Sequence, residues 1–184
     1  MPGTVSTPGR LETVRQFINT LDIEEGTDSI ASVAGLRRWL SEASLLATDS
    51  RVSSGDVAAA RELREALRGA AAANHDGTAL PDDVLAGFNR AAERADLAAR
   101  LTPDRNWRLT PRASGGAGAL GSVVTLVADA MSDGSWRRLK VCGNDSCQWA
   151  FFDTSRSGTG RWCSMAICGN RAKQDAWRAR RRTQ

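Results

Sequence analysis

The sequence predicts a mostly α-helical protein of the α+β class, with a helical N-terminal domain over residues 1–134 and a small cysteine-bearing module over residues 135–184. Apolar residues recur at helical spacing through the first region. All four cysteines lie in the second region, beside short runs of β-forming residues. A chain of 184 residues suits one domain of about 130 residues and an appendage too small to fold alone.

Three helices are predicted from start signals followed by apolar faces. A Thr-Pro pair at residues 7–8 favours the first start, and Asp28 or Ser29 favours the second. The third helix follows Ser53-x-x-Asp56, which resembles a capping box with Asp in place of Glu. The predicted apolar faces are Leu11, Val14, Ile18 and Leu21; Val33, Leu36, Leu40 and Ala43; and Ala60, Leu63, Leu67 and Ala70.

Two further helices complete the N-terminal domain, with little sheet. The polar segment 74–77 breaks the chain, and Pro81 begins the fourth helix. A short β-like piece surrounds Trp107 and Leu109, and after a glycine-rich link the fifth helix ends at Gly134. The apolar faces of these helices are Val84, Phe88, Ala92 and Ala95, and then Leu120, Val123, Val124, Val127 and Met131.

Two motifs in this domain carry only weak signals for a site. The run from Gly116 to Gly121 matches G-x-G-x-x-G, but no apolar strand precedes it, which favours a flexible link over a dinucleotide site. The single histidine, His75, stands in a polar turn beside Asp76, which favours a surface residue. Because no Ser-His-Asp order, HExxH or P-loop occurs, we expect no enzyme activity.

The cysteines form two close pairs, Cys142-x4-Cys147 and Cys163-x4-Cys168, separated by 15 residues. This spacing predicts one structural zinc ion, because each pair can bracket a tight turn and the two turns can meet around a tetrahedral ion. Four thiolates leave no open coordination position for catalysis. The alternative is a set of buried or redox-active thiols.

The residues around the cysteines predict a hairpin followed by a helix. Leu139–Val141 and Trp149–Phe152 are β-like runs, the polar loop Asp153–Gly160 follows, and a helix is expected to start near Cys163 or Ala166. This order suggests a treble-clef-like zinc module. We expect positive φ angles in the knuckles from the glycine and asparagine residues there, Gly143, Asn144, Gly169 and Asn170.

The stretch from Arg161 to Lys173 closely resembles the CGNR zinc finger, a family named for the Cys-Gly-Asn-Arg that here spans residues 168–171. The stretch from Cys142 to Ser155 resembles it too. Two departures are Gly160, where a further basic residue is expected, and Asp145, where proline is common. Neither change touches a cysteine, and the first slightly weakens the basic surface.

CGNR proteins usually carry an N-terminal ABATE domain, which is associated with predicted stress-induced bacterial transcription regulators. The segments Phe17–Asp22 and Leu36–Leu40 resemble that domain. The resemblance implies a bacterial transcription regulator, and it implies some β structure in the N-terminal domain, which the hydrophobic pattern shows only near Trp107.

Charge divides the chain unevenly. Residues 1–135 hold 14 basic and 18 acidic side chains, whereas residues 136–184 hold 11 basic and 3 acidic ones. This asymmetry indicates a nucleic-acid-binding end, the alternative being a solvated basic tail. The sequence starts without a basic-then-apolar leader, and no apolar run approaches the roughly 18 residues needed to cross a bilayer. We therefore expect a cytoplasmic, nucleoid-associated protein without membrane contact.

The last helix, expected from Arg171 to Thr183, is the predicted DNA contact. Its arginine and glutamine face suits a major groove, because Arg pairs with guanine and Gln with adenine, while other basic side chains hold phosphates. Arg171 has a second reading, as a structural hydrogen-bond donor across the zinc knuckle. The expected DNA-binding residues are Arg161, Arg171, Lys173, Gln174, Arg178, Arg180, Arg181 and Arg182.

The small and aromatic residues of the module are expected to pack. Trp149 and Trp162 read as core filler around the zinc site, and Trp177 either packs on the hairpin or stays exposed. The alanine face of the last helix is expected to lie against the module; it consists of Ala172, Ala176 and Ala179.

These observations predict a zinc-containing DNA-binding transcription regulator. Double-stranded DNA is the expected partner, a homodimer is the expected form of many such readers, and the N-terminal domain is expected to dimerise or to sense a small-molecule effector. The alternatives are an RNA-binding protein and a zinc-stapled protein-interaction adaptor.

Overall fold

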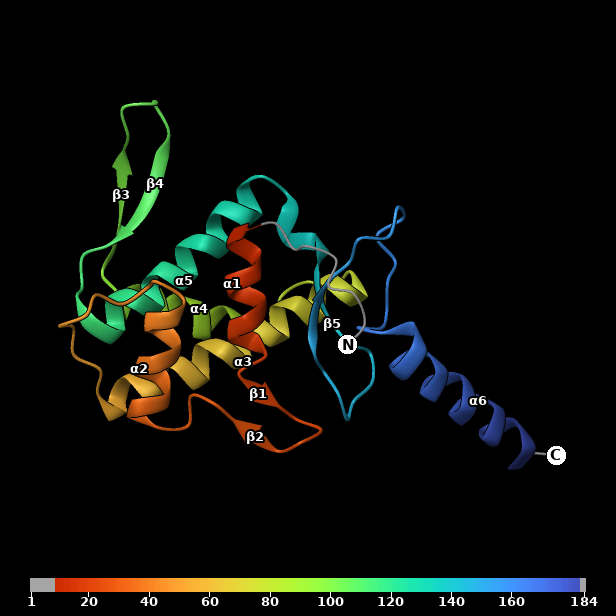
Figure 1. Ribbon diagram of the computed structural model, residues 1–184. Coiled ribbons are helices and arrows are strands. Elements are labelled where there is room, and N and C mark those ends of the chain that lie inside the picture. Colours follow the sequence, from red (N-terminus) through yellow and green to blue (C-terminus); the bar gives the residue numbers. More distant parts are fainter. Residues whose placement is uncertain (1–8, 183–184) are drawn as a thin grey trace.

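The computed structural model describes residues 9–182, so the predicted helix start at residues 7–8 and Thr183 lie outside the described residues. The N-terminal domain is a bundle of five helices in which the long α3 runs through the middle (Figure 1). These helices are α1 (Gly9–Ile18), α2 (Val33–Glu42), α3 (Ser54–Asp76), α4 (Asp82–Arg94) and α5 (Gly115–Ser132). The zinc module follows and ends in α6 (Asn170–Arg182), which projects away from the bundle (Figure 1).

The described strands form three antiparallel hairpins. The hydrophobic pattern does not predict the first, β1 (Leu21–Asp22) with β2 (Thr27–Asp28). It predicts only one strand of the second, β3 (Leu97–Leu101) with β4 (Trp107–Pro111). The third, β5 (Leu139–Val141) with β6 (Ala150–Phe152), is the predicted hairpin of the module. The β structure that the family resemblance implied is therefore present, and it is larger than the hydrophobic pattern alone showed.

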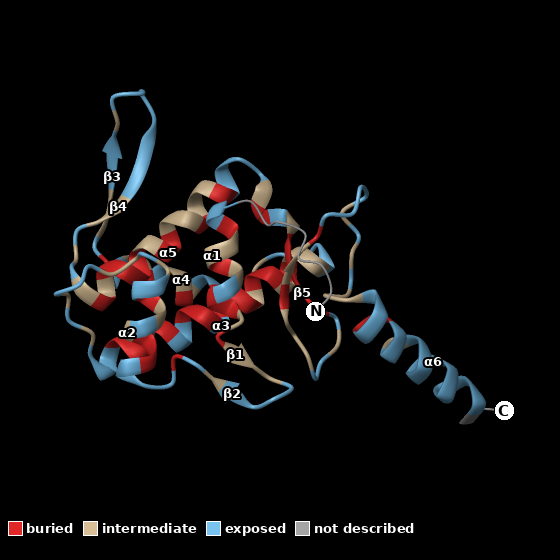
Figure 2. Cartoon of the chain, in the orientation of Figure 1, coloured by how far each residue is buried: buried red, intermediate tan, exposed pale blue. Residues whose placement is uncertain are grey.

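The predicted helical faces form the core between the helices (Figure 2). Four predicted members lie elsewhere: Leu21 is in β1, Val33 and Met131 are exposed, and Ala43 caps the end of α2. Two more, Phe88 and Ala92 of α4, are only half-buried. The buried apolar residues of the predicted faces are Leu11, Val14, Ile18, Leu36, Leu40, Ala60, Leu63, Leu67, Ala70, Val84, Ala95, Leu120, Val123, Val124 and Val127.

The start of α2 differs from the prediction. Ser32 caps the helix by accepting a hydrogen bond from the Gly35 amide at 3.1 Å, so α2 begins four residues after Ser29. Asp28 is instead in β2, where its carboxylate accepts from Arg64 at 2.7 Å. The Asp28 side chain, predicted as a helix cap, therefore forms a long-range ion pair with Arg64 instead.

The start of α3 confirms the predicted capping box of Ser53 and Asp56, but its end corrects the predicted break. The helix continues to Asp76, and Gly77 ends it with a φ of 66°. His75 thus lies in the last helical turn rather than in a surface turn, and its Nδ1 is buried without a hydrogen-bond partner among the described residues.

The glycine-rich segment is not a flexible link, because it forms the first two turns of α5. A Cβ at Gly116 would lie 2.6 Å from Asp56, and one at Gly118 would lie 2.2 Å from the Ala113 carbonyl oxygen. A Cβ at Gly121 would lie 2.3 Å from the Cβ of Ala95. The glycines of the G-x-G-x-x-G pattern therefore allow α5 to pack closely against its neighbours, and the prediction of a flexible link is wrong.

Helix α5 also corrects the expectation that no segment approaches a membrane span. Its 18 residues are long and apolar enough by length and composition, with a mean hydropathy of 1.2. Half of the helix is buried in the bundle, where Val123 and Val127 belong to the core. The apolar composition is that of a core helix.

Candidate metal centre and nucleic-acid interface

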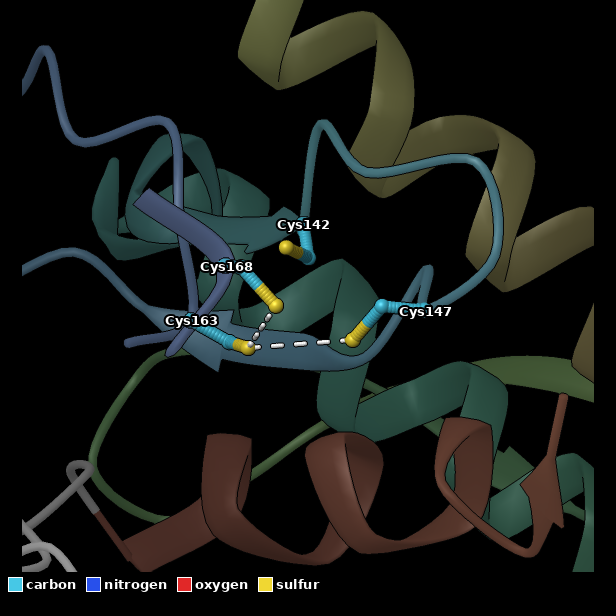
Figure 3. Close-up of side chains that lie close together, drawn as sticks. All are labelled: Cys142, Cys147, Cys163 and Cys168. Atoms are coloured by element: carbon cyan, nitrogen blue, oxygen red, sulfur yellow. Dashed lines mark hydrogen bonds between the residues drawn. The ribbon is translucent and has the colours of Figure 1, made fainter. Parts of the chain in front are cut away.

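The four cysteines meet in one cluster, as predicted (Figure 3). All four sulfur atoms lie within 4.8 Å of one another, and none forms a disulfide. Cys163 Sγ lies 3.8 Å from Cys147 Sγ and 3.7 Å from Cys168 Sγ. Zinc–sulfur bonds of about 2.3 Å in a tetrahedron place neighbouring sulfurs about 3.8 Å apart, so the cluster has the dimensions of a zinc tetrathiolate site.

The thiols of the cluster differ in acidity. A hydrogen bond from Cys163, opposed by burial, lowers the pKa of Cys142 to about 5. Burial raises the pKa of Cys147 to about 11. The pKa of Cys163 is also raised, first by its hydrogen bond to Cys142 and then by burial. One thiolate thus suppresses ionisation of its neighbours, and a bound cation would favour the thiolate form of the ligands.

Backbone hydrogen bonds position the first cysteine pair at the hairpin tip. The Cys142 amide donates to the Trp149 carbonyl at 2.9 Å, which extends the β5–β6 pairing by one residue. The Cys147 amide donates to the Asn144 carbonyl at 2.8 Å, and Asn144 Nδ2 points to Cys168 Sγ at 3.9 Å. The second pair is set by the turn Met165–Gly169, where the Gly169 amide donates to the Ser164 carbonyl at 3.0 Å.

The glycines beside the cysteines act by close approach, which corrects the expected positive φ angles. Among the described residues 142–170, only Gln148 and Gly158 have positive φ. A Cβ at Gly143 would lie 3.3 Å from the Trp162 ring, and one at Gly169 would lie 2.6 Å from Met165 Sδ. The half-buried Trp162 therefore packs between the two knuckles, as expected of core filler.

A buried ion pair orders the loop between the cysteine pairs. Lys140 Nζ lies 2.9 Å from Asp153 Oδ2, and both side chains are almost completely buried. Asp153 also accepts hydrogen bonds from the amides of Ser155 and Gly160. Burial raises the pKa of Asp153, but the hydrogen bonds from Ser155 and Lys140 outweigh it and hold the pKa below its usual value. Sequence reasoning missed this pair, whose only signal is a lysine inside an apolar strand.

The hairpin of the module is docked on the helical bundle through side chains of the N-terminal domain. Asn19 exchanges hydrogen bonds with Ala150, and Arg68 Nη1 donates to the Gln148 carbonyl at 2.8 Å. Asn74 Nδ2 donates to the carbonyls of Trp136 and Leu139. The zinc knuckle is thereby held at the end of α3.

The predicted DNA-binding side chains do not all have the same surroundings. Lys173, Gln174 and Arg180 are exposed on α6, and the side chain of Arg182 lies outside the described part of the chain. Arg161 is exposed beside the zinc site, with its guanidinium carbon 5.9 Å from the centre of the Trp162 ring. The structure thus separates Arg161, next to the cysteines, from the residues on the projecting helix.

Acidic residues contact two members of the predicted DNA face. Arg178 lies 3.5 Å from Asp175 of its own helix, and Arg171 lies 2.7 Å from Glu24 of the N-terminal domain. The hydrogen bond and charge of Glu24 raise the pKa of Arg171. The i,i+3 spacing of Asp175 and Arg178 predicts the first contact, whereas no local sequence pattern predicts the contact between Arg171 and Glu24.

The alanine face of α6 does not lie against the module as expected. Ala176 and Ala179 are exposed, because the helix leaves the module after its first turn (Figure 2). Trp177 is 52% exposed and is covered on one face by Arg181, whose guanidinium carbon lies 4.7 Å from the ring centre. Of the two readings of Trp177, the exposed one is therefore correct.

Two family models match the chain. Residues 138–181 match the CGNR zinc finger. Residues 12–134 match the ABATE domain, described as "Putative stress-induced transcription regulator". A comparison with curated proteins finds no match. The ABATE range covers the helical bundle from within α1 to the end of α5, and the CGNR range covers the hairpin β5–β6 and most of α6.

Proposed function

We propose that the chain, which belongs to the ABATE family described as "Putative stress-induced transcription regulator" and carries a CGNR zinc finger, regulates transcription by binding double-stranded DNA through α6. The observation that carries this proposal is the projecting, basic α6 on a zinc module. The ion holds the hairpin and the turn before α6 together, and the helix extends from this anchor into solvent (Figure 1).

The dimensions and charge of α6 suit a major groove. Its 13 residues include five arginines and one lysine but a single acidic residue, Asp175. A groove about 12 Å wide admits one helix, and arginine side chains pair with both guanine edges and phosphates. The zinc itself is structural and supplies folding free energy rather than chemistry. We accordingly propose no enzyme activity.

Selection of bound sequences from random double-stranded DNA by the full-length zinc-loaded chain tests this proposal. We expect an enriched motif, and binding that weakens steeply with salt. Arg178→Ala should weaken binding, whereas Arg38→Ala, which removes an exposed charge from α2, should not. A palindromic motif supports the homodimer that we include in the proposal. Binding to DNA without any enriched motif would contradict the recognition of specific bases by α6.

An RNA-binding protein is the second candidate, favoured by the exposed Trp177 with Arg181 stacked on it. Aromatic rings and arginine planes stack on unpaired bases. Competition between duplex DNA and single-stranded RNA of the same sequence separates the two candidates. A preference for the single strand that Trp177→Ala abolishes favours RNA.

A further inference from the structure

The turn between β1 and β2 is an acidic segment that reaches the first turn of α6. Asp22, Glu24 and Glu25 lie in or beside this turn, and the Glu25 amide donates to Asp22 Oδ1 at 3.0 Å, which orders it. Glu24 Oε1 accepts a hydrogen bond from Arg171 Nη1 at 2.7 Å. This contact joins residues 147 positions apart, and it connects the N-terminal domain to α6, the proposed DNA-binding helix.

The carboxylate of Glu24 engages the Arg171 guanidinium, a group that would also bind a DNA phosphate. Guanidinium groups bind carboxylates and phosphates through the same planar arrangement of donors. Both side chains are close to half exposed, at 47% for Arg171 and 44% for Glu24, so a phosphate in solution has access to the pair. Arg171 cannot serve both anions fully, and one contact weakens the other.

The turn is anchored in the bundle, so its position depends on the N-terminal domain. Asp28, at the end of β2, accepts hydrogen bonds from Arg64, whose side chain is only 2% exposed. Arg64 also donates to Thr20 at 3.2 Å, just before β1. Both ends of the hairpin are therefore tied to α3, and a shift of the hairpin relative to α3 would move Glu24 with respect to Arg171.

We propose that Glu24 is an intramolecular competitor of DNA, which holds Arg171 and thereby lets the N-terminal domain restrain binding by α6. This inference rests on the proposed function. An exposed ion pair contributes little free energy, so its release should strengthen DNA binding by about two- to five-fold. The restraint is graded: it tunes affinity rather than blocking it.

Titration of fluorescent duplex DNA with the full-length zinc-loaded chain tests the inference. Glu24→Gln should strengthen binding by about two- to five-fold. Glu25→Gln is the matched control, because it removes an equal charge from the same turn but from a residue without an ion pair to Arg171. In an Arg171→Ala background, Glu24→Gln should have no effect, because the competing guanidinium is absent.

Each other outcome overturns the inference. Equal strengthening by Glu24→Gln and Glu25→Gln shows general repulsion between the turn and DNA. Weaker binding by Glu24→Gln shows that the ion pair positions α6 for binding. An unchanged affinity for Glu24→Gln, together with weaker binding by Arg178→Ala, removes the competitor but leaves the proposed function. Absence of duplex binding by the unaltered chain removes both.

Discussion

Asn19 and Ala150 exchange two hydrogen bonds across 131 residues of sequence: Asn19 Nδ2 donates to the Ala150 carbonyl at 2.9 Å, and the Ala150 amide donates to Asn19 Oδ1 at 2.7 Å. The asparagine side chain thus pairs with the first residue of β6 as a neighbouring strand would. This contact joins the end of α1 to the hairpin that carries the zinc site.

Asn19→Ala should destabilise the protein by about 1–3 kcal/mol, because it leaves the buried backbone groups of Ala150 without partners. Urea unfolding of the zinc-loaded protein measures the change. Asn89→Ala removes an exposed amide from α4 and should change the free energy of unfolding by less than about 0.5 kcal/mol. Equal effects of the two substitutions would show that the pairing with Ala150 contributes nothing.

Cys168→Ser should abolish stoichiometric zinc binding, which elemental analysis and a chromophoric chelator measure as a fall from one zinc per chain. The knuckles and α6 should lose order, because zinc binding supplies their folding free energy, while α1–α5 keep their helical signal in circular dichroism. Ser164→Ala, immediately before the turn Met165–Gly169, is the control and should keep zinc. A Cys168→Ser protein that retains one zinc would rule out the tetrathiolate site.

Arg178→Ala and Gln174→Ala should each weaken binding to a selected duplex by roughly 1–3 kcal/mol and should relax its sequence preference. The physical reason is that base edges are read by side chains on one helix face. Fluorescence titration of the selected and scrambled duplexes at two salt concentrations measures both effects. Equal losses on the two duplexes would leave a sequence-independent basic contact.

Asp56→Asn should reduce stability at pH 7 by about 1–3 kcal/mol and should matter less as the solution becomes acidic. Burial raises the pKa of Asp56, but hydrogen bonds from Arg94 and Ser53 outweigh burial and lower the pKa below its ordinary value. A lowered pKa in the folded state means that the stabilisation is present above about pH 4 and is lost as the pH falls further.

Urea unfolding of Asp56→Asn and the unaltered chain at several pH values tests this dependence, since acid effects on the zinc site are common to both proteins. Asp49→Asn, an exposed change between α2 and α3, is the control. A difference between Asp56→Asn and the unaltered chain that stays constant from pH 7 to below pH 4 would contradict the role of the Asp56 carboxylate.

Sequence patterns predicted those parts of the fold and site that depend on neighbouring residues. The spacing of Leu63 and Leu67 on α3, and the capping box before them, are local features. They suffice because helical geometry repeats within a few residues. The prediction of a flexible link at the glycines of α5 is wrong, because glycine is found both where a chain is flexible and where a helix packs closely, and the sequence alone does not distinguish the two.

By itself, the sequence determined the helical bundle, the zinc ligands and the basic C-terminal helix, because periodicity, cysteine spacing and charge are properties of composition and local order. Only the tertiary structure decided which side chains those features meet. It brought Asn19 to Ala150, Lys140 to Asp153 and Glu24 to Arg171. A hydrogen bond or ion pair between distant residues leaves no periodic trace in a single sequence, because the path of the intervening chain brings its two partners together.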